Sequence, residues 1–183
     1  MAAPISIRPA EPRDLAAITR IYDHAVRHGT ASFEIEPPDE REMARRYETL
    51  RAGGFPYVVA ELDGEIAGYA YAGPYRGRVA YRWSVEDAIY IAPSSQRRGI
   101  GRALLDRLIV ESQARGYRQM IAIIGGPSHT PSIALHAAAG FRMIATFEAV
   151  GFQIRPLARQ RPVAAPARRG RHDVALTLSP PPR

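Results

Sequence analysis

The sequence predicts one domain of the α/β class, built around a mixed sheet, and two observations carry this prediction. The length of 183 residues suits a single domain with a sizeable core. The apolar pattern changes between the period of a strand and that of a helix, in the order strand, two helices, three strands, helix, strand, helix and two strands. Because this order is not a regular strand–helix repeat, we expect about six to seven strands that are not all parallel.

The first third of the chain is predicted to contain one strand and two helices. Pro12 and the acidic residues beside it are typical of the first turn of a helix, where the backbone dipole is positive. Gly29 ends this helix, and Asp39, after two prolines, starts the next one, which Gly53 and Gly54 end. The predicted bounds are 5–8 for the strand, about 10–27 for the first helix and about 37–51 for the second.

The middle of the chain is predicted to contain three strands and a helix. Asp63-Gly64 lies between two apolar runs and is typical of a hairpin turn, since glycine tolerates the positive φ that such a turn needs. A loop rich in Gly, Arg and Tyr leads to the third strand, and Gly116 ends the helix after it. The predicted bounds are 57–61, 66–72 and 85–91 for the strands, 73–82 and 93–98 for the loops, and 100–115 for the helix.

The last part of the chain is predicted to complete the sheet. A continuous apolar run over 120–124 is typical of a buried strand, and a short helix over 131–139 and a strand over 142–150 follow it. Residues 154–171 are rich in Pro and Arg without periodicity, which indicates a flexible loop. An alternating segment over about 172–179 is expected to return to the sheet, so the single domain has its core over 3–152.

Composition excludes several classes of protein. The chain has no cysteine, which excludes disulfides, thiolate metal sites and a cysteine nucleophile. No apolar run approaches the roughly 20 residues that cross a bilayer. The N-terminus lacks a charged start followed by an apolar stretch, so we expect neither a membrane partner nor a signal peptide. The expected compartment is the cytoplasm.

The net charge of +7 invites a nucleic-acid partner, but this charge is unevenly distributed. Residues 1–150 contain 18 Arg and 17 Asp or Glu, whereas residues 151–183 contain seven Arg and one Asp. The body of the domain is therefore nearly neutral, and no nucleic acid is expected to bind. All 25 basic residues are Arg, which we interpret as a genomic composition bias.

The segment 89–105 contains the clearest functional signal. A buried strand runs into a loop with Gly99 and Gly101, and a helix follows at once. At such a junction the backbone N–H groups and the helix dipole attract an anion, and glycine lets a pyrophosphate approach the backbone. The alternative is a glycine-rich turn with solvated arginines. The arginines that would add positive charge to the site are Arg97, Arg98 and Arg102.

The complete arrangement resembles the acyl-CoA motif of the GNAT superfamily, whose pattern is Gln or Arg, two residues, Gly, one residue, and Gly or Ala. Gln96-Arg97-Arg98-Gly99-Ile100-Gly101 fits it without gaps, and the segment 132–141 is similar to the superfamily's short helix followed by Gly-Phe. The resemblance implies an acetyltransferase domain of the GNAT fold, with helices on both faces of the sheet, and acetyl-CoA as co-substrate. The residues implied to bind acetyl-CoA are Ile89, Tyr90, Ile91, Gln96, Arg97, Arg98, Gly99, Ile100, Gly101, Arg102, Ala103, His129 and Ser132.

A narrower resemblance, over roughly residues 3–152, is to phosphinothricin acetyltransferases and to methionine sulfoximine or sulfone acetyltransferases. It implies acetylation of the α-amine of a small glutamate-like or methionine-like amino acid by a homodimer. His129 departs from the family pattern, which usually has Asn there to hold the pantetheine arm. The stretches that carry the resemblance are Thr30-Ala31-Ser32-Phe33, Glu36-Pro37, Ala72-Gly73-Pro74-Tyr75, Arg76, Arg78, Ala80-Tyr81-Arg82-Trp83-Ser84-Val85-Glu86 and Ala122-Ile123-Ile124-Gly125.

Two residues are candidates for catalysis. Amines are mostly protonated at neutral pH, and Glu86 resembles the family's catalytic Glu and can act as general base. His136 stands where many superfamily members have Tyr, and its imidazole can protonate the leaving thiolate. As in the superfamily, an N–H at a strand distortion near Tyr90 or Ile91 is expected to bind the oxyanion. The alternatives are a surface ion pair for Glu86 and a structural histidine for His136.

The loop before Glu86 contains the candidates for binding the substrate's acid group. Arg76 and Arg78 carry forked guanidinium groups that match a carboxylate or phosphinate. Tyr81 and Phe33 are expected to wall the pocket. The alternative is that the two arginines are solvated. The five His residues show no ligand spacing typical of a metal site, so no metal is expected.

Two other functions stay open on the sequence alone, because a fold does not determine a function. The first is acetylation of a different amine, such as a polyamine or a peptide N-terminus. The second belongs to another class: a non-catalytic module that binds CoA or nucleic acid. The presence of Glu86 and the nearly neutral body of the chain argue against the second.

Overall fold

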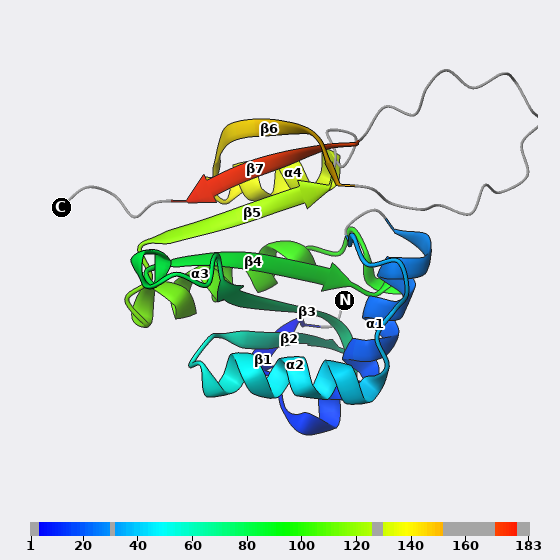
Figure 1. Ribbon diagram of the computed structural model, residues 1–183. Coiled ribbons are helices and arrows are strands. Elements are labelled where there is room, and N and C mark those ends of the chain that lie inside the picture. The colour runs from blue at the N-terminus through cyan, green and yellow to red at the C-terminus, as the bar shows by residue number, and fades with distance from the viewer. Residues whose placement is uncertain (1–3, 30–31, 126–129, 152–170, 179–183) are drawn as a thin grey trace, which may run out of the picture.

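The centre of the molecule is a seven-stranded sheet. The computed structural model describes residues 4–29, 32–125, 130–151 and 171–178. Within them, the strands lie in the order β1-β2-β3-β4-β5-β7-β6, and β4 and β5 are parallel neighbours in an otherwise antiparallel sheet (Figure 1). The strands are β1 (Ser6–Pro9), β2 (Tyr57–Leu62), β3 (Glu65–Pro74), β4 (Ser84–Ile91), β5 (Gln119–Gly125), β6 (Arg142–Gly151) and β7 (Arg171–Leu178). This mixed sheet confirms the predicted fold class.

Helices cover both faces of the sheet. Along β2, alternate side chains point to opposite faces, so Val58 joins the core under α3 whereas Tyr57 and Val59 join the core under α1 and α2. Each layer is closed by buried helix residues, such as Leu104 of α3 and Ile18 of α1. The helices are α1 (Leu15–His28), α2 (Glu40–Ala52), α3 (Ile100–Ala114) and α4 (Thr130–Ala138), with single 3₁₀ turns at Pro12–Asp14, Val79–Tyr81 and Pro93–Ser95.

Local sequence signals explain where the elements begin and turn. Asp39 accepts a hydrogen bond from the backbone N–H of Glu42 at 2.8 Å and so caps the start of α2. Asp63 and Gly64 both have positive φ, 54° and 80°, as a tight turn between β2 and β3 requires. The predicted bounds of these elements therefore lie close to the observed ones.

The last strand, β7, lies between β5 and β6 and pairs antiparallel with both. The chain order of β5, β6 and β7 therefore differs from their order in the sheet. The flexible loop predicted over 154–171 lies outside the described residues up to 170, and Arg171 begins β7. None of the helices in the described part of the chain is long and apolar enough to span a membrane.

Candidate active site

The central feature of the site is the point at which β4 and β5 separate. The two strands pair only at their starts, where 84–86 face 119–121. Beyond Glu86, β4 stays paired with β3 and β5 stays paired with β7, so the two strands diverge toward their carboxyl ends (Figure 1). A cavity of about 380 Å³ lies at this divergence. Its lining residues are Tyr22, Ser32, Phe33, Glu34, Tyr71, Glu86, Asp87, Ala88, Ile89, Tyr90, Ala122, Ile123, Ile124, Gly125, Ser132 and His136.

One edge of β4 presents its backbone to this opening. The N–H of Ala92, directly after β4, donates to the carbonyl of Ala67 at 2.9 Å, on the β3 side. Because peptide groups alternate between the two edges of a strand, those of Ile89 and Ile91 point away from β3 and toward β5. A ligand in the opening can therefore pair with β4 much as a further strand would.

No bulge interrupts the β3–β4 ladder in the region where a distortion of β4 is expected. The register between β3 and β4 runs without a bulge from Gly68 opposite Ile91 to Pro74 opposite Val85. The N–H of Tyr90 therefore belongs to the ladder with β3, whereas that of Ile91 faces the opening. The sequence left both residues open as sources of the oxyanion-binding N–H, and strand parity favours Ile91.

The loop between β4 and α3 has the backbone geometry of an anion site. Gly99 has a φ of 83°, and a Cβ added there would meet no atom within 4 Å, so the backbone is open to solvent. The first helical hydrogen bond of α3 runs from Ala103 N–H to Gly99 O, which leaves the N–H groups of Ile100, Gly101 and Arg102 without helical acceptors. These groups and the dipole of the 15-residue helix favour a phosphate.

The side chains of this loop differ in how free they are to bind a ligand. Gln96, Arg97 and Arg98 are exposed. Arg102 is already engaged: its guanidinium bonds Asp106 at 2.7 Å and the carbonyl of Ala138 at the end of α4 at 2.9 Å. The Ile100 side chain is buried in the core, so only its backbone can face a ligand, while Gly101 and Ala103 are half-buried.

Glu86 lies on the sheet face covered by α1 and α2, half-buried at the narrow end of the opening. Burial, and to a lesser degree the charge of Asp87, raise the pKa of the Glu86 carboxyl above its usual value. The other two carboxylates in the lining are paired: Glu34 with Arg46, and Asp87 with His136. Among the described residues, Glu86 is thus the cavity carboxylate with no cationic partner, which leaves it able to accept a proton.

His136 and Asp87 form a buried pair on the opposite face of β4. The ring Nε2 lies 2.9 Å from Asp87 Oδ2, and Nδ1 lies 2.7 Å from the backbone carbonyl of Ser132. A carbonyl only accepts, so Nδ1 carries a proton. Burial lowers the pKa of His136, but the hydrogen bond and charge of Asp87 outweigh it, so the pKa is raised overall. The pair therefore favours an imidazolium beside a carboxylate.

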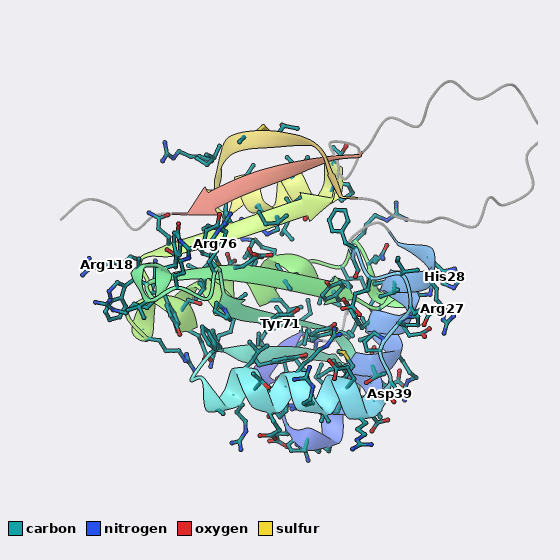
Figure 2. The ribbon with its side chains drawn as sticks, viewed as in Figure 1. Arg27, His28, Asp39, Tyr71, Arg76 and Arg118 are labelled. Atoms are coloured by element: carbon teal, nitrogen blue, oxygen red, sulfur yellow. The ribbon has the colours of Figure 1, made fainter. Side chains whose placement is uncertain are left out.

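Of the four predicted substrate-binding residues, the structure places one in the cavity lining and three outside it. Phe33 lines the cavity. Arg76, Arg78 and Tyr81 are exposed in the loop between β3 and β4 and do not line it. Figure 2 shows Arg76 at the same end of the sheet as Arg118, away from the labelled residues of α1. Its guanidinium lies 5.2 Å from the centroid of the neighbouring Tyr75 ring.

Several cavity residues were not predicted as site residues. Asp87 follows Glu86 directly, and strand alternation would have placed it on the other face, but no local signal linked it to His136, which is 49 residues away on α4. Tyr22 lies on α1 and was not singled out as a site residue. Glu34 and Tyr71 showed no signal at all, because their places in the lining depend on how α1 and the sheet pack together.

The remaining predictions concern His129 and metal binding. His129, the predicted pantetheine ligand that replaces the usual Asn, lies outside the described residues. Within the described part of the chain, no group of three or more His, Asp or Glu side chains is placed to hold a metal ion.

Comparison with known proteins identifies what this arrangement resembles. Residues 18–141 match the acetyltransferase (GNAT) family. The chain is 46% identical over 164 residues to a phosphinothricin N-acetyltransferase of Alcaligenes faecalis, covering 87% of this chain and 83% of that one. It is 38% identical over 147 residues to an L-methionine sulfoximine/L-methionine sulfone acetyltransferase of Salmonella typhimurium, covering 80% of this chain and 85% of that one.

The fold also matches a solved structure. A GNAT superfamily phosphinothricin acetyltransferase from Sinorhizobium meliloti, crystallised with AcCoA, superposes with a TM-score of 0.85 at 41% sequence identity. The match covers 98% of this chain and 89% of that one. The likeness thus extends over most of the chain in sequence and over nearly all of it in fold.

Proposed function

The chain belongs to the acetyltransferase (GNAT) family, and we propose that it transfers the acetyl group of acetyl-CoA to the α-amine of a small glutamate-like or methionine-like amino acid. Phosphinothricin, methionine sulfoximine and methionine sulfone are the first candidate acceptors. The observation that carries this proposal is the unpaired carboxylate of Glu86, placed at the divergence of β4 and β5. The relatives named above supply the substrate class.

The chain offers acetyl-CoA two backbone sites. The free N–H groups at the start of α3 suit its pyrophosphate, with Gly99 and Gly101 leaving room for the phosphates and Arg97 and Arg98 adding charge. The open edge of β4 at Ile89 and Ile91 suits the amides of its pantetheine arm. Bound there, acetyl-CoA supplies an activated acetyl group as a thioester.

Glu86 acts as the general base. The attacking amine must lose a proton first, because amines are mostly protonated at neutral pH. The buried carboxylate of Glu86, with its raised pKa, accepts that proton directly or through a water molecule. The N–H of Ile91 faces the opening and can donate a hydrogen bond to the negative charge that develops on the carbonyl oxygen.

His136 supplies the proton that the leaving sulfur needs. Both ring nitrogens are hydrogen-bonded, Nδ1 to the carbonyl of Ser132 and Nε2 to Asp87, and the raised pKa favours the doubly protonated ring. We take the Nε2 proton as the one transferred, because Nε2 lies beside Asp87, which also lines the cavity. After the transfer the ring takes up a new proton from solvent, and the hydrogen bond with Asp87 favours that uptake. Glu86 and His136 thus serve opposite faces of the opening, one taking a proton and the other giving one.

Arg76 and Arg78 bind the acid group of the substrate, with Tyr81 beside them. Their loop follows β3 closely: Gly73 of β3 lies directly opposite Glu86 across the ladder. The loop therefore enters the site from the end at which Glu86 stands. Because these side chains are exposed in the structure, they reach the substrate by closing on it when it binds.

We also propose that the protein works in the cytoplasm as a homodimer, and that its activity protects a cell from phosphinothricin. Three apolar side chains in the loop between β3 and β4 are exposed and would gain from a partner's cover. They are Val79, Tyr81 and Trp83, exposed by 74%, 39% and 42%. Light scattering after size exclusion tests the dimer, and growth of a sensitive bacterium on phosphinothricin tests protection.

The experiment that tests the proposed reaction is an acetylation screen. Purified protein is mixed with acetyl-CoA and each free amino acid, and the release of the CoA thiol is followed. Turnover with one or more of the three candidate acceptors, and none with a polyamine, is the expected result. Turnover with a polyamine alone would contradict the substrate class while leaving the enzyme class intact.

A further inference from the structure

A ring of hydrogen bonds closes over the segment that follows α1. The Tyr22 hydroxyl donates to Glu34 Oε1 at 2.8 Å and lies 2.9 Å from Ser32 Oγ, which accepts the Glu34 backbone N–H at 3.1 Å. A phenol has one proton and an ionised carboxylate only accepts, so the Ser32 hydroxyl donates to the Tyr22 oxygen. Three residues thus hold one another in a single geometry.

Helix α2 holds the same segment from the other side. The Arg46 guanidinium bonds Glu34 through Nη1 to Oε1 and through Nη2 to Oε2, the latter at 3.3 Å, and its Nε bonds Glu42 Oε1 at 2.8 Å. Glu34 therefore accepts hydrogen bonds from the Tyr22 phenol of α1 and from the Arg46 guanidinium of α2. Both contacts are charge-assisted, and such hydrogen bonds are the strong ones.

The residue between the two anchors is Phe33. It lines the cavity, and its neighbours on both sides, Ser32 and Glu34, are held by the ring of hydrogen bonds. Because both flanking residues are fixed, the backbone that carries the Phe33 ring has little freedom. Arg46 is not part of the cavity lining, and its hydrogen bonds to the lining are those to Glu34.

We propose that Arg46, together with Tyr22, is a positioning residue that holds Phe33 as a wall of the amino-acid pocket. A wall that is ordered before the substrate arrives lowers the entropy lost on binding and so strengthens binding. The proposal rests on the proposed function in one respect: the ligand of the cavity is taken to be the amino acid. The proposal predicts that Arg46 affects the binding of the amino acid and does not affect the binding of acetyl-CoA.

Arg45 provides a matched control for Arg46. The two are adjacent on α2, and the guanidinium of each bonds Glu42, Arg45 at 2.7 Å and Arg46 at 2.8 Å. Only Arg46, of these two, reaches Glu34. Arg45→Met therefore removes the same side chain and a similar surface ion pair without touching the segment that carries Phe33.

Steady-state kinetics with methionine sulfone and acetyl-CoA test the proposal. Arg46→Met is expected to raise the KM for the amino acid about ten-fold, as the loss of a charge-assisted hydrogen bond predicts, with kcat and the KM for acetyl-CoA within about two-fold. Arg45→Met should change none of the three, and Arg46→Lys should recover part of the loss. An unchanged amino-acid KM in Arg46→Met, or an equal rise in both KM values, overturns the proposal.

A double variant separates the effect of the position of Phe33 from the effect of the Glu34 charge. Removing Arg46 also leaves the Glu34 charge unpaired near the cavity. Glu34→Gln combined with Arg46→Met removes that charge while the segment stays released from α2, so the amino-acid KM should remain high. If this double variant recovers the wild-type KM, the effect is electrostatic and Phe33 is not being positioned.

Hydrogen exchange keeps this test independent of the proposed reaction. The backbone amides of residues 32–36 should exchange faster in Arg46→Met than in wild type, and Arg45→Met should not differ from wild type. Unchanged exchange in Arg46→Met overturns the proposal whether or not an acceptor is known. If wild type acetylates no amino acid while Arg46→Met loosens this segment, the proposed function fails and the positioning role of Arg46 stands.

Discussion

Glu86 and Asp87 are consecutive in β4, and their carboxylates point to opposite faces of the sheet. Glu86 lies on the face covered by α1 and α2, whereas Asp87 lies on the face of α4, hydrogen-bonded to His136. Both line one cavity, because β5 leaves β4 directly after Glu86. The reaction we propose therefore has a proton acceptor on one face of the opening and a proton donor on the other.

Glu86→Gln is expected to lower kcat by about 10²–10⁴-fold, the usual contribution of a general base. Acetyl-CoA should bind as before, because the two backbone sites proposed for it, the start of α3 and the edge of β4 at Ile89 and Ile91, do not include Glu86. Activity should recover partly at high pH, where more of the amine is already free. Stopped-flow or steady-state thiol release measures kcat, and full activity of this variant would assign the base elsewhere, with His136 the next candidate.

The pH profile of the wild type follows from the same residue. A base works only when deprotonated, and burial raises the pKa of Glu86 above 4.5. On the acid side, kcat/KM should therefore fall as the pH drops through that raised pKa, which is a higher pH than an ordinary glutamate would give. This fall should disappear in Glu86→Gln, and its persistence would show that another group titrates.

Asp87→Asn should destabilise the fold most at acidic pH. The pKa of His136 is raised above 6.5 in the folded state, so its protonation stabilises the fold fully below about pH 6.5 and this stabilisation is lost as pH rises through the folded pKa. Without the Asp87 charge, burial, the largest cause, lowers the pKa of the ring and is opposed by the hydrogen bond to the Ser132 carbonyl. Breaking a buried ion pair costs about 3–5 kcal/mol.

Urea unfolding at acidic and alkaline pH measures this effect. Asp23→Asn is the control, because Asp23 forms an exposed pair with Arg27 at 2.9 Å and such pairs contribute little. A loss of stability in Asp87→Asn that does not vary with pH would contradict an imidazolium at His136. A loss of kcat larger than that of Asp23→Asn would agree with proton delivery by His136.

Gly101→Asp should abolish acetyl-CoA binding without unfolding the protein. A carboxylate at the start of α3 is favourable for the helix dipole but occupies the proposed phosphate site. A Cβ at this position lies 3.3 Å from Leu135 Cδ2, the end of a side chain that can shift. Gly101→Ala is therefore the control for packing, and its affinity by calorimetry should stay near that of wild type. Unchanged affinity in Gly101→Asp would remove the site from this loop.

Arg76→Ala and Arg78→Ala should mainly raise the KM for the amino acid. A lost charge-assisted hydrogen bond costs roughly 1.5–3 kcal/mol, which corresponds to a rise of ten-fold or more. Arg82→Ala, in the same loop with its guanidinium 5.1 Å from the Trp83 ring centroid, is the control. If all three variants behave alike, these arginines are solvated and the acid group is bound elsewhere.

Deletion of residues 155–169 should leave a folded, active enzyme. Gly151 and Arg171 face each other across the β6–β7 ladder, so the remaining residues 152–154 and 170 can close a short hairpin loop. The deleted stretch has no apolar periodicity in the sequence. The Tm should stay within about 3 °C of wild type, the shift expected for a change near 1 kcal/mol in a chain of this size. A larger loss would show that this stretch stabilises the fold.

Much of the architecture could be predicted from the sequence, because the signals involved are local. The helix and strand periods, the cap at Asp39 and the turn at Asp63-Gly64 each depend on a few neighbouring residues. Gly99 and Gly101, at the start of α3, likewise predict an anion site, because glycine lets a ligand approach the backbone closely. Acetyl transfer to an amine needs a general base, and Glu86 was assigned that role because it resembles the catalytic Glu of a known family.

By itself, then, the sequence determined the order of the elements, the loop at the start of α3 and the candidate base. Only the tertiary structure decided which side chains meet across the opening. Asp87 and His136 are 49 residues apart and Glu34 and Arg46 are 12 apart, and each pair needs two elements to pack at one register. The separation of β4 from β5 is likewise a matter of strand pairing, since β7 pairs with 120–125 along the other edge of β5 whereas β4 pairs only with 119–121. Periodicity reports which face a residue occupies, whereas the partner on that face is chosen by packing.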